Sequence, residues 1–158
     1  MPPVKYGCEH EEDAIRQYET ECSQSVVKCG VFLHSSGLLG GSPDGLLDSD
    51  GIVEIKCPYQ LRDCQETNAF DRLGYLKKGK DLSYELVRTH KYFHQIQGNL
   101  FFTNRDFCDL VVWSPHFMIR VRVDKDPSWG DNITLLQNYY IETVYPKIRE
   151  FYTNENVM

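Results

Sequence analysis

The spacing of apolar residues changes several times along this 158-residue chain, and each spacing predicts a different element. Residues 52–57, IVEIKC, are rich in β-branched side chains and follow Asp50-Gly51, a strong hairpin signal, so they predict a strand. Residues 107–113, FCDLVVW, form a nearly continuous apolar run, which is typical of a central strand covered on both faces. Residues 118–123 alternate between apolar and polar side chains, as an edge strand does.

The first helical pattern covers residues 8–22, where Ala14, Ile15 and Tyr18 form an apolar face. Glu11 falls on the same face. An acid on a buried stripe needs a partner or a function, because burying an unpaired charge costs free energy. The alternative is that Glu11 is a partly exposed surface acid.

Two later segments also have helical spacing. Residues 90–103 carry an apolar stripe and a polar-aromatic stripe beside it: Phe93, Ile96 and Leu100; Tyr92, Gln95 and Asn99. Residues 131–151 predict a last helix, in which Pro146 should produce a kink or a break.

The order of these elements, with short strands also expected at 26–33 and 38–41, predicts an α/β fold in which helices flank a mixed central sheet. A chain of 158 residues fits a single domain, 1–158, whose first six residues we expect to be a frayed leader.

Two charged residues interrupt the strand predicted at 52–57. Because side chains alternate along a strand, the odd-numbered positions point into the core, while Glu54 and Lys56 share the other face. Two charged groups on so apolar a strand are costly unless something pairs with them.

Asp44 is the expected companion. If Asp50-Gly51 closes a two-residue hairpin, the preceding residues run back along the strand and bring Asp44 near Lys56. Strict pairing from such a turn would put Asp44 on the opposite face from Glu54. We therefore expect a local bulge, made possible by Pro43 and Gly45, to re-aim the aspartate.

Two carboxylates offer the hard oxygen ligands that Mg2+ or Mn2+ prefers, and a lysine beside them can hold the attacking water. The strings SPDGL, from Ser42, and GIVEIKCP, which carries Glu54 and Lys56, resemble the PD-(D/E)XK nucleases, in particular the phage lambda-type exonuclease and YqaJ-type viral recombinase branch. The resemblance covers nearly the whole chain and implies a restriction-endonuclease-like core.

The resemblance also implies a larger site. Glu11 lies in a match to the early helix G-x-x-x-E-x-x-A, and Gln95 matches the first glutamine of a Q-x-Q helix beside the catalytic strand. By this resemblance Glu11, Asp44, Glu54 and the backbone carbonyl of Ile55 would hold the metal. Lys56 would position the water and Gln95 would assist. An ordinary surface glutamine is the alternative for Gln95.

The connector after Pro58 is a candidate for nucleic-acid contact, because basic groups attract phosphates and aromatic rings stack on bases. A short helix over 67–76 is expected in it, and a solvated surface loop is the equally weighted alternative. The candidates for nucleic-acid contact are Arg62, Lys77 and Lys78 in this connector, together with Ser42 and Tyr92 outside it.

Composition and cysteine spacing narrow the class of protein, its redox compartment and the metal sites that it could hold. The 23 acidic residues outnumber the 17 basic ones, which argues against a non-specific basic binder of nucleic acid but not against a metal-dependent enzyme. The six cysteines show no C-x-x-C spacing, so we expect buried free thiols in a reducing compartment, with neither zinc nor an iron–sulfur cluster. His90 and His94 are four residues apart but lack an H-E-x-x-H motif, so we expect polar surface or substrate-side histidines.

The site residues and the resemblance together predict a Mg2+-dependent nuclease, and the resemblance alone implies that it acts on double-stranded DNA ends, in recombination or in viral or mobile-element DNA processing. The alternatives are a structure-specific or nicking endonuclease and a non-catalytic domain that binds nucleic acid or protein. The expected partner is DNA, with no membrane, and the resemblance implies a homo-oligomeric ring and a single-strand annealing or recombinase protein as further partners. The expected location is intracellular, cytoplasmic for a phage or bacterial protein and nuclear for a eukaryotic or eukaryotic-virus one.

Overall fold

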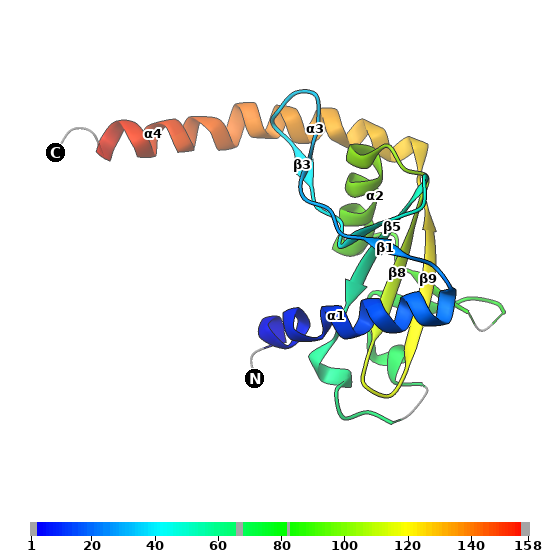
Figure 1. Cartoon of the computed structure of the whole chain (residues 1–158). Helices are drawn as coiled ribbons and strands as arrows, with labels where there is room; N and C mark the ends of the chain where they lie inside the picture. The colour runs from blue at the N-terminus through cyan, green and yellow to red at the C-terminus, as the bar shows by residue number, and fades with distance from the viewer. Residues whose placement is uncertain (1–2, 66–67, 82, 156–158) are drawn as a thin grey trace.

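A computed structural model describes residues 3–65, 68–81 and 83–155 of the chain. Its centre is a five-stranded sheet in the order β1-β4-β5-β8-β9 (Figure 1). These strands are β1 (Val26–Val27), β4 (Gly45–Leu47), β5 (Gly51–Lys56), β8 (Phe107–Trp113) and β9 (Met118–Asp124). β5 and β8 are parallel, and the other neighbours are antiparallel. The predicted α/β fold with a mixed central sheet is confirmed.

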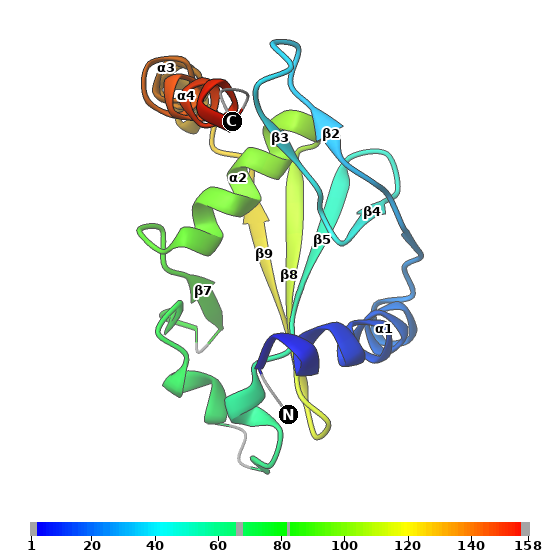
Figure 2. The ribbon, with the colours of Figure 1, turned by 90° about the vertical axis from the view of Figure 1, so that its left-hand side faces the viewer.

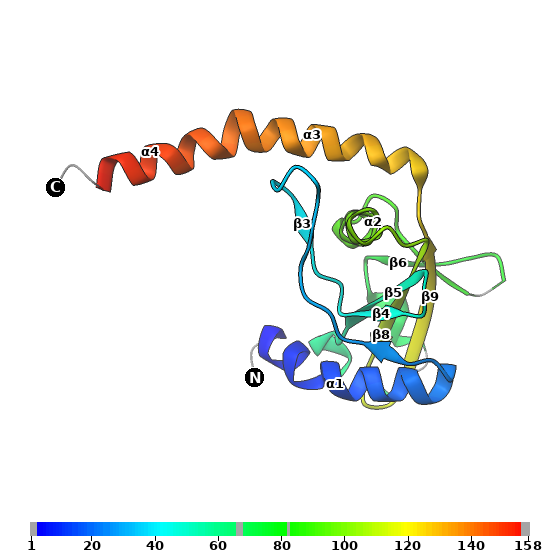
Figure 3. The ribbon, with the colours of Figure 1, turned by 45° about the horizontal axis from the view of Figure 1, so that its top comes forward.

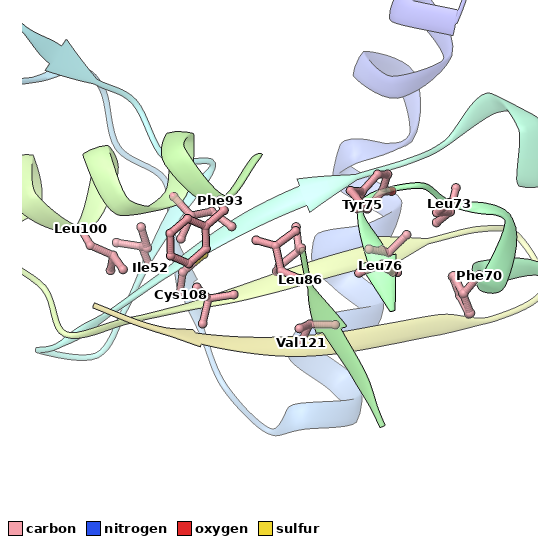
Figure 4. Close-up of a cluster of buried hydrophobic side chains, with 14 of the residues drawn as sticks. Ile52, Phe70, Leu73, Tyr75, Leu76, Leu86, Phe93, Leu100, Cys108 and Val121 are labelled. Carbon is pink, nitrogen blue, oxygen red and sulfur yellow. The ribbon is translucent and has the colours of Figure 1, made fainter. Parts of the chain in front are cut away.

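Helices cover both faces of this sheet (Figure 2). α1 (Pro3–Cys22) lies on one face and buries Ala14, Ile15 and Tyr18 against β5 and β8. α2 (Lys91–Thr103) lies on the opposite face. Figure 4 shows Phe93 and Leu100 of this helix beside Ile52 and Cys108 of the sheet. Burial on both sides explains why residues 107–113 are apolar almost throughout.

One buried side chain in that run is charged. Asp109 of β8 is completely buried, and it accepts hydrogen bonds from the Tyr18 hydroxyl (2.6 Å) and from Nε of Arg122 (2.5 Å). A buried charge is tolerated when it is paired and hydrogen-bonded. These contacts join α1 to β8 and β9.

The N-terminal part differs from the predicted boundaries. α1 begins at Pro3, not at residue 8, so residues 3–6 are helical and Tyr6 is buried. The strand expected at 26–33 is two strands, because the chain leaves the main sheet after β1. β2 (Phe32–Leu33) pairs instead with β3 (Gly40–Gly41) in a separate hairpin. A turn over residues 34–37 closes that hairpin, with Gly37 at φ 69°.

The connector after Pro58 has more structure than its sequence suggested. It contains two 3-10 helices, Tyr59–Leu61 and Ala69–Arg72, followed by a hairpin of β6 (Leu76–Lys78) and β7 (Tyr84–Leu86). The helix expected over 67–76 is therefore limited to its middle; residue 67 lies outside the described residues.

The C-terminal helix extends beyond the body of the molecule (Figures 1 and 3). After a 3-10 turn at Pro127–Gly130, α3 (Asp131–Tyr139) continues through a π-helical turn (Tyr140–Val144) into α4 (Tyr145–Glu155). The irregularity expected at Pro146 takes the form of this π-helical turn just before the proline, and the helix continues past it. No helix within the described ranges is long and apolar enough to cross a membrane.

The expected burial of the cysteines is wrong for most of them. Cys108 is buried, Cys8 is exposed, and the other four are half-buried. Cys8 lies on the part of α1 that lines the open cavity described below, so its side chain is accessible.

Candidate active site

A cavity of about 720 Å3 opens at the carboxyl end of β5. α1, β5 and α2 all contribute to its wall, and so does the segment between β3 and β4. The cavity brings together all five side chains that the sequence placed in the site: Glu11, Asp44, Glu54, Lys56 and Gln95.

The register of the β4–β5 hairpin accounts for the position of Asp44. Gly45 pairs with Val53 and Leu47 with Gly51, so the connecting loop has three residues, 48–50, and not the expected two. Continuing this register sets position 44 opposite Glu54, on the same face of the hairpin. The expected bulge is therefore unnecessary, and the two-residue turn at Asp50-Gly51 is wrong.

Two features stabilise the three-residue loop. Asp48 has a φ of 43°, in the left-handed region that aspartate tolerates better than most residues. Arg105, just after α2, donates to the carbonyl oxygens of Leu47 (3.0 Å), Asp48 (2.9 Å) and Gly51 (2.9 Å). A contact from a distant part of the chain thus helps to set the register at the site.

Glu54 is the most buried acid of the cluster, with 2% of its surface exposed. Its Oε1 accepts a hydrogen bond from Nζ of Lys56 (2.8 Å) and one from the Gln95 amide. Its Oε2 accepts a longer one from Asn99 (3.4 Å). Gln95 and Asn99, which are four residues apart on α2, therefore donate to the two oxygens of the same carboxylate.

Burial dominates the electrostatics of the acids. It raises the pKa of Glu54; Lys56 opposes this shift and Asp44 adds to it. Burial also raises the pKa of Asp44, against the hydrogen bond from the Ile55 N–H (2.6 Å) and the charge of Lys56. The pKa of Glu11 is raised by burial and then by Asp44. The pKa of each of the three carboxylates is thus raised mainly by burial, and the charge of Lys56 offsets only part of this shift.

Lys56 remains a cation in this setting. Burial lowers the pKa of its ammonium group, but Glu54 and Asp44 outweigh burial, and the pKa lies above its usual value. Nζ also lies 4.9 Å from the centre of the Tyr92 ring, which favours the charged form through a cation–π contact.

The donor types in the cavity suit a hard divalent cation, since Glu11, Asp44 and Glu54 offer carboxylate oxygens and Ile55 contributes to the same wall. As the side chains lie, no three His, Cys, Asp or Glu within the described residues are close enough together to hold a metal ion. The oxygens of Glu54 are instead taken by Lys56, Gln95 and Asn99. A cation held by this set would share the oxygens of Glu54 with these donors or replace some of them.

Asn99 is also a site residue. The helical spacing placed it on the same stripe as Gln95, but the sequence indicated no role for it. It is 4% exposed and contacts Glu54. Its spacing of four from Gln95 was the available signal, because residues four apart lie on one face of a helix.

The candidates for nucleic-acid contact fall into two groups. Ser42 and Tyr92 line the cavity. Arg62, Lys77 and Lys78 are absent from its described lining and form ion pairs with Asp63, Glu85 and Asp71, respectively. Their contact with nucleic acid stays a prediction. The histidines have structural contacts: His90 accepts from the Tyr92 N–H at the start of α2, and His94 accepts from the Trp129 indole.

The sheet, its flanking helices and the acids at the end of β5 define a domain of the restriction-endonuclease-like class. A model of the YqaJ-like viral recombinase domain matches residues 1–106, two thirds of the chain. The chain therefore belongs to this family, and the predicted resemblance is confirmed.

Two curated relatives are both named alkaline nuclease. The protein of Orgyia pseudotsugata multicapsid polyhedrosis virus is 29% identical over an alignment of 125 residues, and the match covers 68% of this chain and 30% of the relative. That of Autographa californica nuclear polyhedrosis virus is 29% identical over an alignment of 137 residues, and the match covers 75% of this chain and 32% of the relative. The chain thus spans about a third of the length of these relatives.

Solved structures support the fold. An alkaline exonuclease of Laribacter hongkongensis matches with a TM-score of 0.73 and 23% identity, over 99% of this chain and 75% of that one. A phage-related exonuclease of Haemophilus somnus matches with a TM-score of 0.63 and 16% identity, over 91% of this chain and 73% of that one.

Proposed function

We propose that this chain is a Mg2+-dependent DNA nuclease domain that hydrolyses phosphodiester bonds at the ends of double-stranded DNA, in recombination or in viral or mobile-element DNA processing. The observation that carries the proposal is the meeting of Asp44, Glu54 and Lys56 with Glu11 and Gln95 around one cavity. The family and the names of the relatives support the same chemistry.

Each residue has a role that its surroundings suit. Glu11, Asp44, Glu54 and the carbonyl of Ile55 would hold Mg2+, with Mn2+ as a substitute. The ion, when bound, supplies Lewis-acid stabilisation of the charge that develops on the phosphate. Lys56 is charged and next to Glu54, so it can orient the attacking water and offset negative charge.

Gln95 contributes a neutral amide. Because it carries no charge, it can orient Glu54, the lysine or a phosphate oxygen without competing for the cation. Its position on a rigid helix keeps this donor at a fixed place beside β5.

The test is digestion of linear, nicked and closed circular duplex DNA with Mg2+ or Mn2+, using linear DNA labelled at either the 5′ or the 3′ end. We expect products from linear ends only and loss of activity in EDTA. Cutting of closed circles would favour an endonuclease instead. No cutting with either ion would favour a non-catalytic domain.

Two variants sharpen this assay. Glu54→Gln should abolish cleavage, because it removes a buried charge from the site. Glu12→Gln is the matched control, since Glu12 is an exposed acid next to Glu11 on α1. It should cleave as the parent does.

The proposed assembly is a homo-oligomer that works with a single-strand annealing or recombinase protein. Apolar side chains on the C-terminal helix support contact with another polypeptide.

A further inference from the structure

A second cavity, of about 300 Å3, adjoins the candidate active site. It lies between α2, the β2–β3 hairpin and the start of the C-terminal helix. Ser42 and Gln95 line both cavities, so the two meet at these residues. A chain-like substrate whose reacting group lies at Glu54 can therefore continue past Gln95 into the second cavity.

The lining of this second cavity suits a sugar-phosphate chain. Of the described residues that form it, none is acidic, although the protein as a whole carries a formal net charge of −6. Its walls include three glycines, which let a ligand approach the backbone closely: Gly40, Gly41 and Gly98. Phe102 and Trp129 supply an aromatic side.

His94 gives the cavity a directed donor. The indole Nε1 of Trp129 donates a hydrogen bond to Nδ1 of His94 at 3.0 Å, so the neutral ring carries its proton on Nε2. His94 is exposed and lines the cavity, one residue before Gln95 on α2. The hydrogen bond from Trp129 occupies Nδ1 of His94, whereas the Nε2–H remains available to donate to a ligand.

We propose that the second cavity binds the nucleotide next to the scissile bond, with the Nε2–H of His94 donating to an oxygen of the adjacent backbone phosphate. This inference rests on the proposed nuclease function and adds a subsite to it. A backbone phosphate is the favoured acceptor because it occurs at every nucleotide, whatever the base, and because no described carboxylate repels it there.

The first test measures binding without cleavage, as the fluorescence anisotropy of a labelled duplex with the protein in EDTA. We expect His94→Ala to weaken binding by about tenfold, the effect of losing one hydrogen bond to a charged group. His116→Ala, which removes an exposed histidine from the turn between β8 and β9, should bind as the parent does. Equal affinity of parent and His94→Ala would overturn the inference.

A second variant separates contact from packing. His94→Gln keeps a side-chain N–H that can donate to a phosphate oxygen, so it should recover most of the affinity that His94→Ala loses, even if its melting temperature is as low as that of His94→Ala. If His94→Gln bound DNA as weakly as His94→Ala does, the role of His94 would be structural and the inference would fail.

The contacted phosphate can be located with duplexes that carry one uncharged methylphosphonate linkage at a time. In the parent, a methylphosphonate at the linkage next to the scissile bond should weaken binding. In His94→Ala the same methylphosphonate should cause no further loss of affinity, since the imidazole that contacts this phosphate is already gone. The same loss in both proteins at every linkage would contradict the contact. If the parent neither bound nor cut DNA, the proposed function and the subsite would both fall, whereas a fully active His94→Ala removes the subsite alone.

Discussion

Glu54 is the residue on which the other site residues converge. It is nearly inaccessible to solvent, and donors from β5 and from α2 address its two oxygens. A buried carboxylate is stable only with such partners, because desolvation disfavours its charged form. The ammonium group of Lys56 therefore has a structural effect that can be measured apart from catalysis.

Replacing Lys56 by Met should destabilise the metal-free protein by about 3 kcal/mol at pH 8, since it leaves the buried Glu54 and the half-buried Asp44 without their cation. The folded-state pKa of Glu54, already raised by burial, rises further in this variant. A raised acid pKa gives stability that is present below the unfolded-state pKa and is lost as the pH rises through the folded-state pKa. The deficit should therefore shrink on acidification.

The measurement for Lys56→Met is urea unfolding at pH 8 and pH 5. Lys28→Met is the control, because Lys28 is an exposed lysine paired with Glu12, and exposed ion pairs contribute little to stability. A deficit independent of pH would show that the stem of Lys56, and not its charge, stabilises the fold.

Replacing Asp44 by Asn should abolish cleavage while leaving the metal-free melting temperature unchanged or higher by roughly 2–4 °C. The reason is that burial raises the pKa of Asp44, so its charge is unfavourable in the folded protein above that pKa. The asparagine oxygen can still accept from the Ile55 N–H. A fall of several degrees in a thermal melt would instead identify Asp44 as a structural cap of β5.

Mg2+ should raise the melting temperature of the parent protein, because a ligand that binds only the folded state stabilises it. At a concentration about 100 times the dissociation constant, the gain is about 2.7 kcal/mol. The double variant Asp44→Asn, Glu54→Gln should show no such shift. An equal shift in both proteins would place the bound ion elsewhere.

At the scale of elements, the short β2–β3 hairpin is held close to α2, and Gly41 makes this possible. A methyl group added at Gly41 would lie 2.1 Å from Oδ1 of Asn99 and 3.0 Å from Cδ2 of Phe102. Asn99 is buried and bonded to Glu54, so it has little freedom to move aside. The packing of the hairpin is thus coupled to the site.

Gly41→Ala should therefore cost about 1–3 kcal/mol of stability and reduce activity, as overpacking in a tight contact does. Gly30→Ala is the matched control before the same hairpin, because nothing lies within 4 Å of its added methyl group. It should stay within about 0.5 kcal/mol of the parent. Chemical unfolding and the DNA digestion assay measure the two effects, and equal behaviour of the two variants would contradict the coupling.

At the scale of the whole molecule, the C-terminal helix is the unusual feature. It extends away from the sheet (Figure 3). Large apolar side chains are exposed along much of its length. They are Leu135, Leu136, Tyr139, Ile141, Tyr145, Ile148, Phe151 and Tyr152. Soluble monomers rarely expose so much contiguous apolar surface.

This surface predicts that the chain associates with itself as its concentration rises, which light scattering after size-exclusion chromatography can measure. The double variant Ile141→Glu, Ile148→Glu should shift the protein toward the monomer. Thr134→Glu, Asn138→Glu adds the same charge at exposed polar positions of α3 and should not. A parent that stays monomeric at high concentration would contradict the prediction.

The sequence by itself determined the central strands, the two helices that cover them and the five residues that meet at the cavity. The elements and the trio Asp44, Glu54 and Lys56 follow from local periodicity and short motifs, which depend on neighbours in the chain, and the resemblance to a known family added Glu11 and Gln95. Tertiary structure decided the three-residue hairpin loop, because Arg105 reaches it from beyond α2. It also decided the partners of Asp109 and the second cavity beside His94, since both join segments far apart in the chain and no local pattern records which distant segments will pack together.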